Sequence, residues 1–118
     1  MDSSEFIQAV KLYVRDAAIE DTITNLKRPS GRRVLPQERE RSDWYNQLSA
    51  ADVGHVNSVI ISAVHGALFG LFVVLDGDRA IEDSETKGRF ELSYVGKQRV
   101  VLNDQKNIGL HDLFNAAD

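Results

Sequence analysis

The chain has 118 residues, of which 42% are hydrophobic and 27% are charged, the balance of an ordinary globular protein. Its formal net charge of −4 argues against a general nucleic-acid binder, and its lack of cysteine excludes disulfides, thiolate metal sites and a cysteine nucleophile. The polar start, MDSSEFIQ, does not have the pattern of a signal peptide. We therefore expect one cytoplasmic domain over residues 1–118.

A first helix is predicted from Ser3 or Ser4, either of which can cap it, to about Leu26. Pro29 follows and disfavours helix at the residue before it. Apolar side chains recur at steps of three and four residues along this segment, which predicts one buried face. They are Phe6, Val10, Tyr13, Val14 and Ala17.

Residues 27–41 are predicted to form a mobile loop, because they contain both prolines of the chain and many charged side chains. The basic ones are Lys27, Arg28, Arg32, Arg33, Arg39 and Arg41. Clustered arginines suit phosphate or carboxylate groups, but glutamates dilute this cluster and no aromatic side chain is interleaved for stacking on bases. A solvated loop is therefore favoured over nucleic-acid contact.

A short helix is expected from Ser42, in the segment SDWYNQL. Trp44 and Leu48 are four residues apart, so both are expected to face the core. If Trp44 or Tyr45 were exposed instead, it would be a suitable aromatic anchor for a protein partner.

A long helix is predicted from about Ala50 to Leu75, with Ser49 as its cap and Gly77 placed to end it. The run from Val59 to Leu75 is at the short edge of what spans a bilayer, but it contains His65, and no basic residue lies near its N-terminal side. The sequence favours a buried core helix over a membrane span.

Small residues recur every fourth position along this helix, and we call them the glycine-serine row. They are Gly54, Ser58, Ser62, Gly66 and Gly70. Glycine inside a helix costs about 1 kcal/mol relative to alanine, so the row predicts close approach of another backbone. That backbone would be the first helix of the same chain or a second copy of the protein.

The segments RFELSYV and RVVLN predict an antiparallel β-hairpin, because apolar and polar side chains alternate in the first. Opposing Tyr94 to Val100 also sets Leu92 against Leu102 and gives one apolar face. This register needs a connection with an odd number of residues around Gly96. We expect the apolar face of the hairpin to lie on a helix, since two strands alone are marginal.

Leu110, Leu113 and Phe114 have helical spacing and predict a short C-terminal helix over the core. The expected fold is thus α+β and mainly helical. A long buried central helix is packed by the N-terminal helix, with one hairpin and a short C-terminal helix.

The sequence predicts no metal site, no cofactor and no catalytic set. His55 and His65 would lie about 15 Å apart along one helix, so they cannot share a metal ion. His65 is expected to be a core histidine, and no nucleophile elbow or phosphate loop is present. An enzyme that used His65 or His111 with a carboxylate would need a polar pocket around one of them.

Carboxylates cluster directly after the long helix, and we call them the acidic segment. They are Asp76, Asp78, Glu82, Asp83 and Glu85. The segment does not fit an EF-hand calcium loop, because Ile81 and Lys87 stand where glycine and glutamate are needed. It could be a solvated loop or a docking surface for a basic protein partner.

The stretches WYNQLSAAD, ALFGLFVVLDGDRAIED, FELSYVGKQRVVLND and LHDLFN resemble a group of small bacterial single-domain proteins with no established activity. The size and acidity are also similar to immunity proteins, which shield bacteria from toxins. The leading hypothesis is therefore a non-catalytic protein that occludes a basic toxin domain through the acidic segment. The alternative is a small regulatory or structural module that dimerises through the glycine-serine row.

Overall fold

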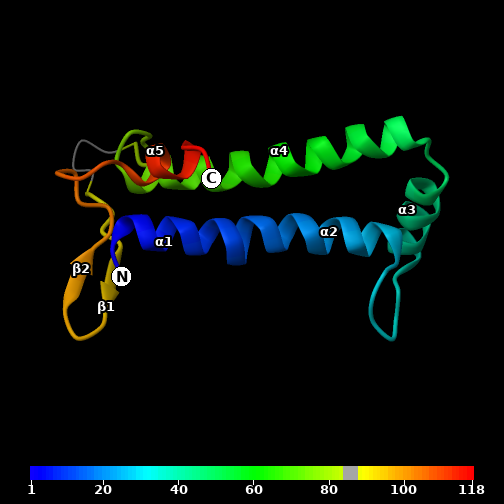
Figure 1. The fold of residues 1–118 in the computed structure, drawn as a ribbon, viewed down its shortest axis with the longest axis horizontal. Helices are drawn as coiled ribbons and strands as arrows, with labels where there is room; N and C mark the ends of the chain where they lie inside the picture. Colours follow the sequence, from blue (N-terminus) through cyan, green and yellow to red (C-terminus); the bar gives the residue numbers. More distant parts are fainter. Residues whose placement is uncertain (84–87) are drawn as a thin grey trace. The chain divides into compact units, whose positions relative to one another are not determined.

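A computed structural model describes residues 1–83 and 88–118. The elements are α1 (Ser3–Val10), the π-helix η1 (Lys11–Asp16), α2 (Ala17–Lys27), α3 (Pro36–Asn46), α4 (Ala50–Leu75), β1 (Ser93–Val95), β2 (Arg99–Val101) and α5 (Leu110–Asn115). This order confirms the α+β class, with a long helix, an antiparallel hairpin and a short C-terminal helix (Figure 1).

The chain forms two compact units. Unit 1 comprises Met1–Val14 and Gly66–Asp118, and unit 2 comprises Arg15–His65. The boundaries fall within η1 and α4, so each of these helices contributes residues to both units.

The first helix begins at the predicted position, but its cap is different. The side chain of Asp2, rather than that of Ser3 or Ser4, accepts a hydrogen bond from the N–H of Glu5 at 2.8 Å. Ser3 Oγ instead donates to the carbonyl of Leu102, which ties the start of α1 to the end of the hairpin. Asp2 is as good a cap as serine, and it leaves Ser3 free for this contact.

The predicted apolar face of the first helix is confirmed at Val10, which is buried, and is wrong at Tyr13 and Val14, while Ala17 is partly buried. Tyr13 is 74% exposed and Val14 is 47% exposed. The reason is η1, because a π-helical turn is wider than an α-helical turn and breaks the spacing of three and four residues. Lys11 is buried there instead, and its Nζ donates to the carbonyl of Ala116 at 3.0 Å.

The core of unit 1 joins α1, the last turns of α4 and α5. Its buried members are Ile7, Val10, Phe72, Leu110 and Phe114. The rings of Phe72 and Phe114 have centroids 5.2 Å apart, which agrees with α5 lying beside the end of α4 in Figure 1. The prediction that the C-terminal helix covers the core is confirmed.

The hairpin has the predicted register. Tyr94 pairs with Val100, and residues 96–98 form the odd-length connection. The expectation that its apolar face is covered by a helix is wrong for most of that face, since Phe90 is 52% and Tyr94 43% exposed. Burial is confined to the base of the hairpin, where Leu102 lies inside unit 1.

Unit 2 corrects the predicted loop over residues 27–41, because α3 already begins at Pro36. Proline is well suited to the first turn of a helix, where its missing N–H is not needed. Trp44 was expected to face the core but is 52% exposed, whereas Tyr45 is 2% exposed. The hydroxyl of Tyr45 donates to Asn57 Oδ1 at 2.9 Å, which joins α3 to α4.

The bounds of α4 are those predicted, and Ser49 Oγ caps it by accepting from the N–H of Asp52. The expectation that this helix is buried is wrong, because only Phe72 and Val73 are buried along it. Among the described residues α4 is also the one helix long and apolar enough to cross a membrane, by length and composition. Apolar composition predicted burial, but the rest of the helix is only partly buried on one side and exposed on the other.

Candidate functional site

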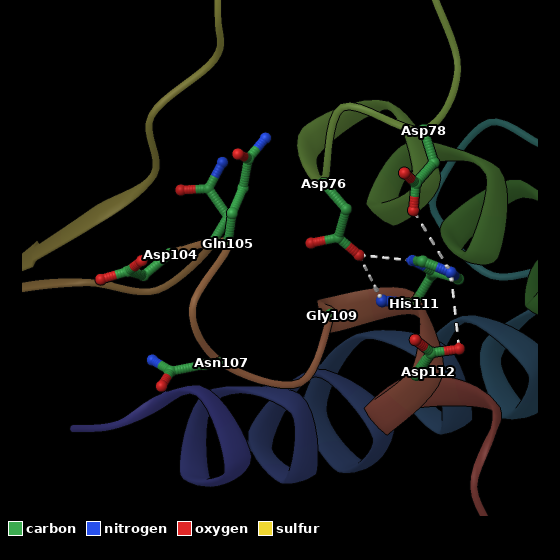
Figure 2. A pocket seen from close by; sticks show the side chains of 9 residues that line it. Asp76, Asp78, Asp104, Gln105, Asn107, Gly109, His111 and Asp112 are labelled. Atoms are coloured by element: carbon green, nitrogen blue, oxygen red, sulfur yellow. Dashed lines mark hydrogen bonds and ion pairs between the residues drawn. The ribbon is translucent and has the colours of Figure 1, made fainter.

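A polar pocket of about 250 Å³ lies in unit 1, where α4 ends and α5 begins (Figure 2). Its lining includes the carboxylates Asp76, Asp78, Asp104 and Asp112, together with His111. The acidic residues come from the end of α4, from the segment after β2 and from α5. Folding therefore gathers groups that are up to 36 positions apart, from Asp76 to Asp112, in the sequence.

Asp76 is the centre of this site. Its carboxylate accepts hydrogen bonds from the backbone N–H of Leu110 at 3.0 Å and from that of His111 at 2.9 Å. It also accepts from His111 Nδ1 at 2.5 Å. The side chain is only 7% exposed, so these donors replace water around a buried charge.

These contacts make Asp76 the cap of α5. The residue at the N-cap position is Gly109, which has no side chain to offer, and Asp76 supplies the missing acceptor from the end of another helix. Gly109 also gives room for this arrangement. A Cβ at that position would lie 3.0 Å from Asp76 Oδ2 and 3.3 Å from His111 Nδ1.

His111 faces carboxylates on both sides of its ring. While Nδ1 donates to Asp76, Nε2 lies 3.5 Å from Asp112 Oδ1 and 3.7 Å from Asp78 Oδ2. The hydrogen bond to Asp76 raises the pKa of His111 above its ordinary value of 6.5. Burial lowers this pKa, whereas the charges of Asp112, Asp76 and Asp78 raise it further.

Asn103 makes three hydrogen bonds beside the pocket. Its Oδ1 accepts from the N–H of Leu92 at 2.9 Å, and its Nδ2 donates to the carbonyls of Leu75 at 2.6 Å and Phe90 at 2.9 Å. The residue is 8% exposed. It therefore joins the end of α4 to the segment that leads into β1.

The pocket offers carboxylates and one imidazole, which can accept or donate protons, together with side-chain amides. The residues that line it include no serine, threonine, tyrosine, cysteine or lysine that could act as a nucleophile. In residues 1–83 and 88–118, no group of three or more histidine or carboxylate side chains is placed to hold a metal ion. The polar pocket that an enzyme using His111 with a carboxylate would need is present, and Asp76 is the carboxylate bonded to His111 in it.

The structure separates the residues of the acidic segment. Asp76 is an internal cap, whereas the side chain of Asp78 is 64% exposed and Glu82 and Asp83 are exposed. Glu85 lies outside the described residues. Of the two candidate aromatic anchors, Trp44 is exposed and Tyr45 is not, since it belongs to the interior of unit 2.

The glycine-serine row is open over most of its length. A Cβ at Gly54 or at Gly66 would meet no atom within 4 Å, and Ser58 and Ser62 are exposed. Gly70 differs, because a Cβ there would lie 3.0 Å from Arg79 Nη1. The expected packing of the chain's own first helix is therefore absent at Gly54 and Gly66.

We call the exposed side of α4 in unit 2 the open face. It comprises Gly54, His55, Ser58, Val59, Ile61 and Ser62, all exposed. On the other side of the same helix Val53, Val56, Asn57, Ile60 and Val64 are partly buried. From Val53 to Leu75 no residue is aspartate, glutamate, lysine or arginine, so the open face bears no permanent charge.

The pairing of Asp76 with His111 and the role of Asn103 were not predicted from the sequence. One local signal existed, since Gly109 leaves the C-terminal helix without a capping side chain of its own. The sequence could therefore indicate that a cap comes from elsewhere, but not that Asp76 provides it.

Comparisons of the chain with protein families, with curated proteins and with solved structures find no match. The resemblance to small bacterial single-domain proteins and the likeness to immunity proteins stay predictions. The site must therefore be interpreted from its own geometry.

Proposed function

We propose that this chain is a non-catalytic protein-binding module that pairs with a second copy of itself through the open face of α4. The observation that carries the proposal is an exposed helix face without permanent charge. Val59 is 68% exposed and Ile61 is 48% exposed on it. These two large apolar side chains lie exposed on a helix side that otherwise carries small and uncharged residues, a composition that suits contact with another protein.

A protein surface suits the open face better than a lipid bilayer does. A spanning helix needs about 20 apolar residues in contact with lipid or with other membrane segments. The last turns of α4 are already used inside unit 1, where Phe72 and Val73 are buried and the carbonyl of Leu75 accepts from Asn103. Only the earlier part of the helix is left to be covered.

A second copy suits the open face because of its composition. Two uncharged faces can meet about a two-fold axis without like charges opposing one another. Gly54, Ser58 and Ser62 are small, so two helices can approach closely along them. The presence of Gly54, which is costly inside a helix, then has a structural reason.

Replacing Val59 with lysine is expected to break the pair, because the pairing would have to bury an ammonium group on each of the two faces. Light scattering should give about twice the 13.2 kDa of one chain for the unchanged protein and a single-chain mass for Val59→Lys. Val95→Lys is the matched control. Val95 is 75% exposed, but it lies on the hairpin in β1, and the control should keep the mass of the pair.

Equal masses for Val59→Lys and the unchanged protein would refute the assignment to the open face. A single-chain mass for the unchanged protein would refute the pairing itself. In that case flotation with phosphatidylcholine vesicles would assign the face to lipid instead.

The exposed acidic residues favour a second candidate function, in which a basic protein such as a toxin domain docks on the chain and is occluded. Asp78, Glu82 and Asp83, all in unit 1, supply the charge for this candidate, and the exposed Trp44 is not assigned to the same surface because it belongs to unit 2. Such a surface would steer association with a positive partner, and salt would weaken the effect.

Charge reversal at Asp78, Glu82 and Asp83 tests this second candidate. With the product of an adjacent toxin reading frame as probe, the triple lysine variant should associate more slowly, and its rate should lose most of its salt dependence. Surface plasmon resonance at two salt concentrations measures both effects. An unchanged association rate would exclude this surface as the docking site.

A further inference from the structure

The helix α5 depends on its contacts with the rest of unit 1. It has six residues, which is far too short for a helix that is stable by itself. Two of them, Leu110 and Phe114, are fully buried against Ile7 and Phe72. Release of α5 would therefore uncover the apolar core of unit 1.

One set of contacts is electrostatic and lies at the N-terminal end of α5. Asp76 accepts from two backbone N–H groups of α5 and from the ring of His111, so one carboxylate holds both the helix end and the imidazole. A second set of contacts lies just beyond the other end of α5. There buried Lys11 donates to the carbonyl of Ala116 and forms an ion pair with Asp118 at 2.9 Å.

Among the described residues, the charged side chains that face the ring of His111 are all carboxylates. Asp76 and Asp78 come from the end of α4, and Asp112 comes from the first turn of α5. The ring edge contacts Phe69 of α4, with centroids 5.8 Å apart. Across the pocket lies one more carboxylate, that of Asp104, and no lysine or arginine is among the residues that line the pocket.

We propose that α5 is a proton-controlled latch, closed while His111 carries a positive charge between the carboxylates of α4 and α5 and loosened when that charge is lost. An imidazolium joins Asp76 and Asp78 to Asp112 by attraction. A neutral ring keeps only the hydrogen bond to Asp76 and leaves these carboxylates to repel one another across the junction of the two helices.

The direction of the response follows from the raised pKa of His111 in the folded chain. The proton adds stability that is fully present below the ordinary value of 6.5 and is lost as the pH rises through the folded pKa. The latch is thus closed at acidic pH and loosens toward alkaline pH.

Amide hydrogen exchange of the full chain between pH 6 and pH 9, followed by NMR, tests the latch. The reporters are the N–H groups of Leu113 and Ala116, which bond to the carbonyls of Gly109 and Asp112. The reference is the N–H of Leu102, which bonds to Leu92 at the base of the hairpin. After correction for intrinsic exchange rates, protection of the reporters should fall several-fold relative to the reference as the pH rises.

Two variants keep this test decisive. His111→Asn retains a donor for Asp76 but cannot titrate, so its protection ratio should not change with pH. The double variant Asp78→Asn/Asp112→Asn changes exposed side chains only. It should move the transition, and the titration of the His111 ring, together to lower pH.

A constant protection ratio in the unchanged protein would overturn the latch. So would a pH dependence that persists in His111→Asn, or a transition that stays in place in the double variant.

Discussion

Replacing Asp76 with alanine is expected to lower the free energy of unfolding by about 3 kcal/mol, from the loss of charge-assisted hydrogen bonds and of a helix cap. The variant leaves the N–H groups of Leu110 and His111 and the ring of His111 without their acceptor. All three belong to the junction that holds α5 on the core. Urea denaturation followed by circular dichroism measures the change.

Asp78→Ala is the control for this prediction. Asp78 also lies close to His111, but the Asp78 side chain is 64% exposed, and its Oδ2 is 3.7 Å from Nε2 of His111. Its removal should cost less than about 0.5 kcal/mol, because exposed ion pairs contribute little. Equal losses for the two variants would mean that Asp76 acts through general charge and not as the cap of α5.

Replacing Asn103, which is itself buried, with alanine is expected to cost about 2 kcal/mol, because it leaves three partly buried backbone groups without their partner. These groups are the N–H of Leu92 and the carbonyls of Leu75 and Phe90. Amide exchange should also show the N–H of Leu92 losing its protection, since its acceptor is gone.

Asn107→Ala is the matched control for Asn103→Ala. Asn107 belongs to the same connection between β2 and α5 and is exposed. Its replacement should change the free energy of unfolding by less than about 0.5 kcal/mol. If Asn103→Ala proved as harmless as this control, Asn103 would not be what joins the end of α4 to the hairpin.

The features predicted correctly from the sequence are those fixed by neighbouring residues. The cap at Ser49 and the glycine at position 77, which has a φ of +82°, set the bounds of α4. Alternation of apolar and polar side chains set the register of Tyr94 against Val100. Each of these depends on a few adjacent positions.

The features that could not be predicted depend on contacts between distant positions. Asp76 is 34 positions from Leu110, and no local pattern links a carboxylate after one helix to the cap of another. The π-helical segment Lys11–Asp16 likewise leaves no clear mark in the sequence, yet it changes which side chains face the core.

The burial of α4 was predicted wrongly for a different reason. Apolar residues indicate that a helix must be covered, but they do not say by what. The chain covers Phe72 and Val73 with its own core and leaves Val59 and Ile61 exposed. The pairing proposed here assigns the missing cover to a second copy, and the latch at α5 is independent of it.

Disulfide formation by single-cysteine variants tests the pairing most directly, because the chain contains no cysteine of its own. Under mild oxidation, Ser58→Cys or Ser62→Cys on the open face should form linked pairs much faster than Ser4→Cys, an exposed control in α1. Gel electrophoresis without reductant gives the rates. If both open-face variants cross-link no faster than Ser4→Cys, two copies do not meet along α4.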